Sequence, residues 1–524
     1  MNQTYEATAG EKGARSSWPC SRTLLLGIAV GVILLYALGL TDLWRFQRDS
    51  AIYMGLARSI VEGEGYRFNH ENHTFYTPGL PLMLAATGSI TEVPQLLTDS
   101  FLGYNLLLTC LGLGSILLFY FLLRELDLPP PVFVAAFLFF AFSRTLYYYS
   151  THIMTDVPFT FFAIGSLLLG FIAVRRKGWK SWLAVGGAGF TVMAASSVRP
   201  VGPLLLMAIT GGIWLHWDVL DEWKRKLGQT LLLWIPAVTA LGAYAYWTRT
   251  LKSEGGRHYF RGYLRADRII EFFLTLLEKS GEHMGGLSDA LLGTDAGVIP
   301  GVILAVLLAV GLVKLLKSGE RQFSIFALLL GGVIIAGGWP LGRRYLLPAI
   351  PVMCIWLALG GYTVGQYLHT RREWWTRSRV RKLGYSCVAI VLLVNLIRIG
   401  DVVIEQRRGL YEEVQDGKLT DYRPVLEWLR ENETNDDVLI IGYEASTIHY
   451  FTRLRTKHVR DRDTEDWSRE KTLEWAREAD YIIKDEEKAE STAAFEKHLP
   501  TDNLKLEPVV REGMVTLLRV VREQ

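Results

Sequence analysis

The chain has 524 residues, a formal net charge of +3 and an apolar fraction of 50%, and its mean hydropathy is +0.20. A soluble globular protein seldom has this composition. The small net charge gives no support to nucleic-acid binding by bulk electrostatic attraction. The four cysteines, Cys20, Cys110, Cys354 and Cys387, have no CxxC spacing, which argues against a disulfide framework and a zinc site.

Apolar blocks of close to 20 residues, the length that a helix needs to cross the hydrocarbon core, recur through residues 23–400. A polar tail at residues 1–22 precedes the first block, and no A-x-A-like cleavage site follows it, which predicts a retained span rather than a signal peptide. The stretch 78–90 is too short to span and is predicted to lie at the interface or to re-enter. We predict about eleven spans, at residues 23–41, 101–123, 131–149, 157–174, 182–197, 201–217, 229–247, 298–316, 323–339, 345–362 and 385–399.

Positive charge alternates along the connections between these blocks. Basic residues are concentrated near 175–180, 224–226, 314–321 and 371–382. Because Lys and Arg are retained on the cytoplasmic side of short loops, we expect these loops and the N-terminus to be cytoplasmic. We then predict that the non-cytoplasmic side carries the long segments 42–100 and 248–297, three short turns and the C-terminal region. This pattern predicts a multi-pass protein, which we assign to a bacterial plasma membrane.

The pattern changes at residues 401–524 to mixed charge with short apolar runs. It predicts helices at 423–431 and 469–479 and strands at 438–441, 481–483 and 514–521. The expected fold class is therefore a polytopic α-helical membrane protein with a small C-terminal α/β domain, which packs on the membrane part or touches the acceptor. Gly442 is not part of a GxGxxG fingerprint, so a nucleotide site there has no support.

Two acidic residues stand at the predicted outer ends of spans. The segment RDSAIY at 48–53 places Asp49 just outside the first span, where a hydroxyl acceptor and a lipid headgroup would meet. The segment TDVPF at 155–159 places Asp156 at the outer start of the fourth span. Each could be only a helix cap. Topology nevertheless brings both carboxylates to one face, as a membrane-surface active site requires.

Arginines mark the same face, although short outer loops are normally poor in positive charge. Arg199 follows the fifth predicted span, and Arg343 and Arg344 precede Tyr345 at the start of the tenth. A guanidinium suits the phosphate of a lipid carrier, and the alternatives are snorkelling to headgroups or pairing between helices. The basic and aromatic segment 257–265, which contains His258, either covers a lipid-phosphate donor or lies at the interface, and the interface is favoured.

This set of segments resembles the GT-C superfamily, in the branch with the protein O-mannosyltransferases and the bacterial aminoarabinose transferase that modifies lipid A. The resemblance covers residues 20–400, and the matching residues are Arg48-Asp49, YTPGLP at 76–81, TDVPF at 155–159, Arg199-Pro200 and Arg343-Arg344-Tyr345 with Pro348. It implies inverting transfer of a hexosyl or pentosyl group from a polyprenyl-phosphate carrier to a hydroxyl on a protein, lipid or glycan.

The resemblance also implies roles for individual residues. Asp49 would be the general base, and Asp156 would position the acceptor or bind a cation. The group Arg199, Arg343, Arg344 and Tyr345 would bind the carrier phosphate and stabilise its developing charge. Further contacts with substrate are expected from Arg48, Tyr53, Tyr76 and His258. The acid and Lys that commonly precede the Pro of the second motif are missing before Pro78, so the resemblance leaves a divalent cation undecided.

Two other classes of function fit a polytopic chain. A transporter or lipid flippase would place its ionisable residues near mid-membrane, whereas these charges lie at the predicted outer ends of spans. A catalytically inactive relative could act as a scaffold, but the presence of both aspartates argues against that class. The expected partners are therefore a lipid-linked sugar donor, an acceptor and membrane lipids, with no nucleic acid.

Overall fold

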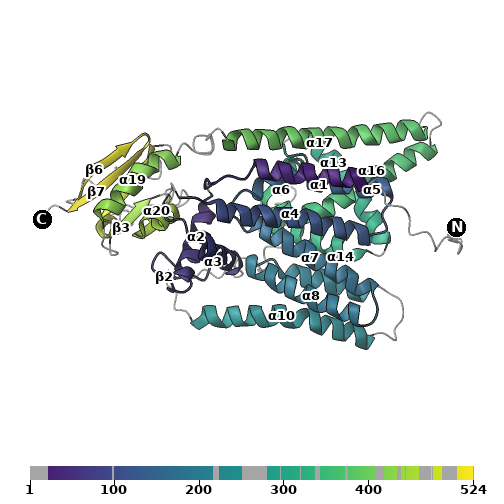
Figure 1. Cartoon of the computed structure of the whole chain (residues 1–524), viewed down its shortest axis with the longest axis horizontal. Helices are drawn as coiled ribbons and strands as arrows, with labels where there is room; N and C mark the ends of the chain where they lie inside the picture. The colour runs from purple at the N-terminus through teal and green to yellow at the C-terminus, as the bar shows by residue number, and fades with distance from the viewer. Residues whose placement is uncertain are drawn as a thin grey trace.

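The computed structural model describes residues 22–45, 47–96, 99–215, 223–250, 280–294, 297–318, 320–336, 343–371, 376–407, 418–433, 438–442, 444–458, 474, 476–486 and 504–522. A bundle of α-helices carries a small lobe with a β-sheet at one end (Figure 1). This arrangement confirms the predicted fold class, a polytopic helical protein with a C-terminal sheet domain. We call the end of the bundle next to the lobe the sheet end.

Every predicted span falls on helix, but not every helix is long. Eight of the described helical segments are long and apolar enough to cross a membrane. They are α4 (Leu102–Glu125), α5 with α6 (Pro130–Ala141 and Arg144–Tyr149), α7 (Asp156–Arg175), α8 (Trp179–Val198), α10 (Trp223–Thr250), α13 (Val298–Lys317), α15 to α16 (Arg343–Leu346, Leu347–Ala349 and Ile350–Arg371) and α17 (Arg377–Arg407).

The remaining three predicted spans correspond to shorter apolar helices, α1 (Arg22–Leu38), α9 (Pro203–Leu215) and α14 (Arg321–Ala336). The predicted number of about eleven spans is therefore not confirmed by helix length. Another helix, α12 (Ser280–Leu292), lies within the segment 248–297 that was predicted to be an outer connection.

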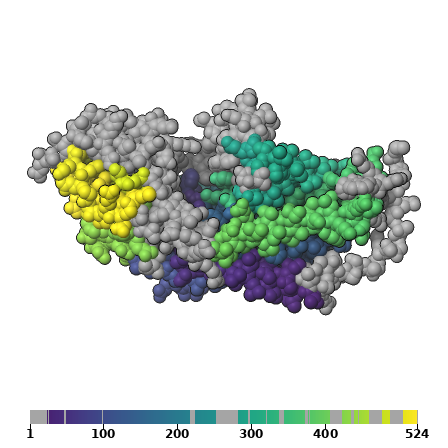
Figure 2. All heavy atoms as spheres, turned by 90° about the horizontal axis from the view of Figure 1, so that it is seen from above, coloured from purple at the N-terminus to yellow at the C-terminus, as the bar shows by residue number. Residues whose placement is uncertain are grey.

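Burial separates the inner helices from the outer ones. In α7 and in the segment Arg343–Arg371, 72% and 78% of the apolar 18-residue stretch is buried inside the protein, against 17% in both α10 and α17. Figure 2 shows α17, in green, lying along the surface, and its side chains Leu383, Ile390 and Leu393 are exposed. Exposed apolar helices of this kind are suited to contact lipid. The two inner segments are those that carry Asp156 and Arg344.

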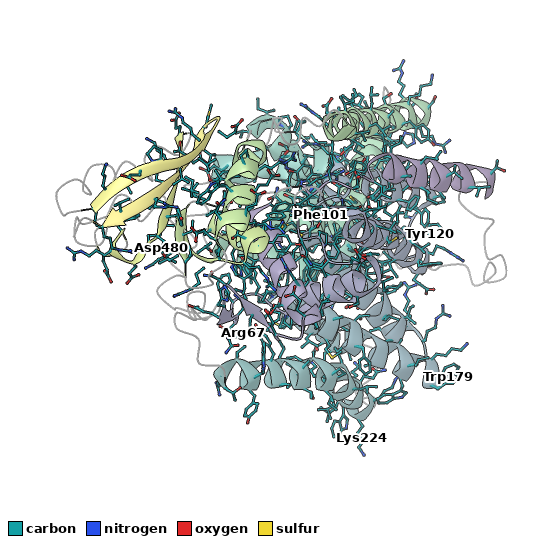
Figure 3. The ribbon with its side chains drawn as sticks, turned by 60° about the vertical axis from the view of Figure 1, so that its left-hand side comes forward. Arg67, Phe101, Tyr120, Trp179, Lys224 and Asp480 are labelled. Carbon is teal, nitrogen blue, oxygen red and sulfur yellow. The ribbon has the colours of Figure 1, made fainter. Side chains whose placement is uncertain are left out.

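The connections gather at opposite ends of the bundle. Arg175 at the end of α7 contacts Glu125 at the end of α4 and Glu320 before α14, and Arg225 in α10 donates to the Arg176 carbonyl. Figure 3 shows Trp179 and Lys224 on this side, away from Arg67 near the lobe. These basic connections share one end, as the alternation predicted. Which end faces the cytoplasm remains a prediction.

The segment after α1 forms a cap at the sheet end. It contains α2 (Arg48–Val61), the two-stranded hairpin β1 (Arg67–Phe68) and β2 (Glu71–Asn72), and α3 (Gly79–Thr91), which covers the stretch predicted to be too short to span. The start of α3 packs directly on the end of α8. A Cβ at Gly79 would lie 2.6 Å from the Ser197 carbonyl carbon, and Thr77 Oγ1 donates to the Val198 carbonyl at 2.9 Å. Only glycine allows this approach.

The C-terminal lobe contains a five-stranded mixed sheet in the order β4-β3-β5-β7-β6. Its strands are β3 (Leu439–Gly442), β4 (Arg455–His458), β5 (Tyr481–Asp485), β6 (Leu504–Glu512) and β7 (Val515–Arg522), and its helices include α19 (Lys418–Asn432) and α20 (Ala445–Thr452). The three predicted strands are present, and so is the helix predicted at 423–431. The predicted helix at 469–479 lies largely outside the described residues. The sequence analysis missed β4 and β6.

Candidate active site

Asp49 lies in the first turn of α2 and faces two other segments. Gln47 takes the N-cap position, so the structure does not support the capping alternative for Asp49. Its Oδ1 accepts a hydrogen bond from the Tyr76 hydroxyl at 2.9 Å, and its Oδ2 accepts one from Arg344 Nη2 at 2.6 Å. With 24% of its side chain exposed, the carboxylate remains accessible to a ligand.

Asp156 begins α7 and is completely buried, with Thr155 at the N-cap. Its Oδ1 lies 2.8 Å from Arg199 Nη2, and its Oδ2 lies 3.4 Å from Arg344 Nε. These are ion-pair distances, yet neither oxygen accepts a well-directed hydrogen bond from the described residues. A carboxylate without water around it needs nearby positive charge, which the two guanidinium groups supply.

Arg344 connects the two carboxylates, and Arg199 completes the group. We call Asp49, Asp156, Arg199 and Arg344 the Asp–Arg cluster. Two negative and two positive charges make it neutral. Arg199 follows the last residue of α8, and its Nε donates to Thr155 Oγ1 at 3.1 Å. The fold thus brings four separate chain segments to one point at the sheet end.

Aromatic rings surround the carboxylate of Asp49. The Tyr53 ring lies edge-on to Tyr76 at 5.0 Å between centroids, and His73 stacks on Tyr76 at 5.4 Å. Burial, followed by the nearby Asp49 charge, raises the pKa of Tyr53 and of Tyr76. Burial lowers the pKa of His73 to about 4. At neutral pH the Tyr76 phenol is therefore a hydrogen-bond donor to Asp49, and His73 is uncharged.

Arg343 is next to the cluster in sequence but pairs elsewhere. Its Nε lies 2.8 Å from Asp289 Oδ2 of α12, and its guanidinium lies 5.6 Å from the Tyr148 ring centroid. Its Nη1 is buried and has no hydrogen-bond partner among the described residues. The Tyr345 ring lies 6.0 Å from the Arg344 guanidinium. Arg343 therefore offers one unused donor beside the cluster.

The structure brings together most of the predicted site residues. The sequence analysis had named every residue of the cluster, and also the nearby Tyr53, Tyr76 and Tyr345. Arg343, which it had also named, forms its ion pair with Asp289 instead. Arg48 begins α2, but its side chain is not among those described. His258 lies outside the described residues.

Three contributors were missed by the sequence analysis. Thr155 had been placed inside a motif but given no role, and His73 lies in the polar stretch before Tyr76. Asp289 lies in the second half of α12, whose first turn also carries Glu282, and the sequence offered no signal that singled it out.

The described residues do not assemble a metal site. No group of three or more His, Cys, Asp or Glu side chains there could hold an ion. The cluster offers two carboxylates, and the Arg344 guanidinium reaches both. In this arrangement a guanidinium neutralises the charge that a divalent cation would otherwise balance. We therefore derive no chemical step through a metal.

Comparison with solved structures shows the fold that this geometry belongs to. The chain is similar to ArnT from Cupriavidus metallidurans in the apo state, with a TM-score of 0.59 at 11% identity over 95% of this chain and 97% of that one. The structure of the same protein bound to undecaprenyl phosphate matches with a TM-score of 0.59 at 10% identity, over 95% and 98%.

The archaeal oligosaccharyltransferase AglB from Archaeoglobus fulgidus, in complex with an inhibitory peptide and a dolichol-phosphate, matches with a TM-score of 0.57 at 13% identity. That match covers 97% of this chain and 75% of AglB. No protein-family model and no curated protein sequence matches. The structural likenesses confirm the GT-C fold predicted from the sequence.

Proposed function

We propose that this protein is a membrane glycosyltransferase that moves a sugar from a polyprenyl-phosphate carrier to a hydroxyl acceptor at the sheet end, on the non-cytoplasmic side. The observation that carries the proposal is Arg344 lying between two carboxylates, one accessible in Asp49 and one buried in Asp156. A carrier of this class is supported by two structures of the same fold, one bound to undecaprenyl phosphate and one in complex with dolichol-phosphate.

Asp49 acts on the acceptor in this mechanism. Its carboxylate takes the proton of the acceptor hydroxyl while that oxygen forms a bond to the anomeric carbon of the sugar. The bond from the anomeric carbon to the carrier phosphate breaks on the opposite side, and its electron pair leaves with the phosphate. The product is therefore inverted at the anomeric carbon. Before the donor binds, Tyr76 and Arg344 hold the carboxylate in position through one contact each.

The arginines act on the carrier. The departing phosphate gains negative charge, and fixed donors that face the place where charge develops stabilise the transition state. Arg344 is one such donor, and we assign Arg343, the residue before it, as another. Asp156 is completely buried against Arg199 and Arg344, so we assign it the role of holding these guanidinium groups. It is a positioning residue rather than an acceptor contact.

The placement of the charges favours an enzyme over a transporter. A transport pathway would have ionisable residues near the middle of the spans. Asp156 is the first residue of α7, Arg199 directly follows α8, and Arg344 is the second residue of its helical segment. The cluster therefore lies at helix ends, where a lipid headgroup and an acceptor from outside could meet.

One experiment tests the proposal directly. Purified protein in nanodiscs receives labelled polyprenyl-phosphate sugars of several kinds, together with protein, lipid and glycan acceptor fractions. We expect the label to move to one acceptor class with the parent protein and to stay on the carrier with Asp49→Asn. Asp99→Asn is the matched control, because Asp99 accepts backbone hydrogen bonds from Gln95 and Leu96. Movement of intact carrier across vesicles without label transfer would indicate a flippase instead.

A further inference from the structure

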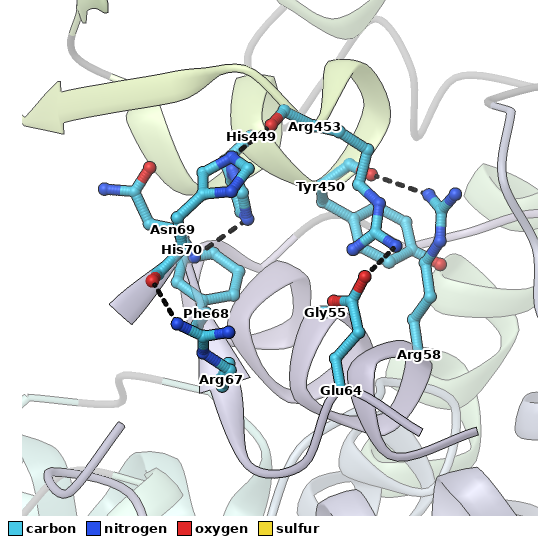
Figure 4. A pocket seen from close by; sticks show the side chains of 10 residues that line it. All are labelled: Gly55, Arg58, Glu64, Arg67, Phe68, Asn69, His70, His449, Tyr450 and Arg453. Carbon is cyan, nitrogen blue, oxygen red and sulfur yellow. Dashed lines mark hydrogen bonds and ion pairs between the residues drawn. The ribbon is translucent and has the colours of Figure 1, made fainter. Parts of the chain in front are cut away.

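A pocket lies between the cap at the sheet end and the C-terminal lobe (Figure 4). Its volume is about 250 Å³, and its walls come from α2, the β1–β2 hairpin and α20. Pockets that enclose drug-sized ligands are usually about 300–1,000 Å³. This one therefore suits a charged head group rather than a whole oligosaccharide.

Hydrogen bonds across the pocket fix its walls relative to each other. Asn69 N donates to His449 Nε2 at 2.8 Å, and the Asn69 side chain bonds to the backbone N–H and carbonyl of Thr456, each at 2.8 Å. His70 Nε2 lies 2.6 Å from the Arg453 carbonyl oxygen. Asn69 and His70 both have positive φ, as a two-residue hairpin turn of type I′ requires. The pocket is therefore formed before any ligand binds.

Positive charge in the pocket exceeds the negative charge that could balance it. Arg58 Nε lies 2.8 Å from Glu62, and Arg453 shares the same carboxylate, with Glu64 at 3.7 Å. Within the described part of the chain, Arg67 has no carboxylate at ion-pair distance, and its Nη2 donates to a carbonyl of the hairpin turn. Burial and the neighbouring Arg58 lower the pKa of Arg453 to about 10.

His449 adds no fixed charge that would replace the arginines. His449 Nε2 accepts the Asn69 N–H, so its Nδ1 carries the proton and donates to the Leu454 carbonyl at 2.9 Å. This arrangement holds the neutral form of the ring. The cations that face the pocket are therefore the guanidinium groups, which bind oxyanions through paired N–H donors.

We propose that this pocket binds a phosphate group of the acceptor. The inference rests on the proposed function and narrows its substrate to an anionic acceptor. Arg67 supplies one guanidinium from the hairpin, and Arg58 and Arg453 supply the others from the opposite side of the pocket (Figure 4). A phosphate in the pocket would supply the negative charge that the two nearby glutamates provide only in part.

The position of the pocket also sets the size of the acceptor. Arg58 and Asp49 lie on the same helix, nine residues apart, which corresponds to about 14 Å along the axis. Three rings in successive contact connect the two sites: Phe68 lines the pocket, His73 lies 6.3 Å from Phe68 and 5.4 Å from Tyr76 between centroids, and Tyr76 donates to Asp49. The acceptor therefore carries its phosphate about 14 Å from the accepting hydroxyl, which fits a phosphorylated glycan or glycolipid and not a simple alcohol.

Thermal unfolding of the full chain tests phosphate binding without any transfer reaction. The protein is placed in phosphatidylcholine nanodiscs and titrated with inorganic phosphate or with sodium chloride of equal ionic strength. A ligand at concentration c that binds only the folded state increases the free energy of unfolding by RT ln(1 + c/Kd), so the unfolding temperature rises with the ligand concentration. We expect phosphate to stabilise the parent, and Arg67→Gln to weaken the apparent affinity about tenfold. Arg511→Gln, at an exposed position of β6, is the control and should behave like the parent.

A second arm identifies the source of the phosphate. If the phosphate belongs to a lipid head group, nanodiscs that contain phosphatidic acid should stabilise the parent but not Arg67→Gln. If it belongs to a soluble acceptor, inorganic phosphate should stabilise the parent but not Arg67→Gln. Either result supports the site. Equal responses of the parent and Arg67→Gln, or no phosphate-specific response in either arm, would overturn it. Because binding is measured apart from turnover, this outcome is independent of whether a sugar is transferred.

Discussion

Replacing Asp49 by Asn removes one charge from the Asp–Arg cluster and changes little else. The Asn side chain can still accept the Tyr76 hydroxyl, but it loses the 2.6 Å ion pair with Arg344. The two partners keep 24% and 30% of their side chains exposed, so solvent screens part of this interaction. We expect a loss of about 1 kcal/mol of stability, between the values for exposed pairs and for fully shielded charged hydrogen bonds.

Turnover should fall far more than stability. A general base typically contributes about 10²- to 10⁴-fold in rate, and the side-chain amide of the variant cannot accept the proton of the acceptor. Transfer of label and thermal stability are to be measured on the same purified Asp49→Asn protein, beside Asp99→Asn. In the control the backbone N–H groups of Gln95 and Leu96 lose a charged acceptor but keep an amide oxygen, so stability should fall slightly and turnover should be kept. Parent-like turnover in Asp49→Asn would remove Asp49 from the mechanism.

Three further predictions concern the arginines, His449 and the membrane topology. Arg344→Gln leaves the buried Asp156 carboxylate with one guanidinium and should lower the free energy of unfolding by about 3 kcal/mol. Arg343→Gln should weaken donor binding and lower the free energy of unfolding by less. Equal stability of the two variants would contradict this. Burial lowers the pKa of His449 from 6.5 to about 4. Its contribution to stability, complete above pH 6.5, is therefore lost as the pH falls towards 4, and unfolding scans of His449→Gln should be less sensitive in that window. A reporter after residue 410 should be outside and one within 371–382 cytoplasmic; the same side for both would refute the topology.

The sequence predicted the helices because apolar blocks report burial in lipid or protein directly. The positive charge of alternate connections then predicted which connections share an end of the bundle. This was enough to place Asp49 and Asp156 at the same end. The pairing of Asp49 with Arg344, 295 positions apart, could not be read in the same way. Local periodicity carries no distance between helices, so it could not show which arginine would reach which carboxylate.

The strands that were missed have a different cause. The residues of β4, Arg455 to His458, are polar and charged, and β6 is interrupted at Pro508, where its register with β7 shifts. Both strands lie at the edges of the sheet, where one side of the backbone is unpaired and side chains meet solvent. An edge strand lacks the apolar pattern of a central strand such as Leu439–Gly442, so the sequence pattern alone does not detect it.

The arginines show that the predicted place of a side chain does not determine which group it pairs with. The sequence analysis assigned Arg199 and Arg344 to phosphate because outer loops rarely carry positive charge, and the structure pairs both with aspartates. Under the proposed function a carrier phosphate must therefore replace a carboxylate at Arg344. If Arg344 pairs with the phosphate, the arginine keeps an anionic partner while Asp49 loses its guanidinium partner. Donor binding would then free the base for the acceptor proton, which couples the two halves of the reaction through one side chain.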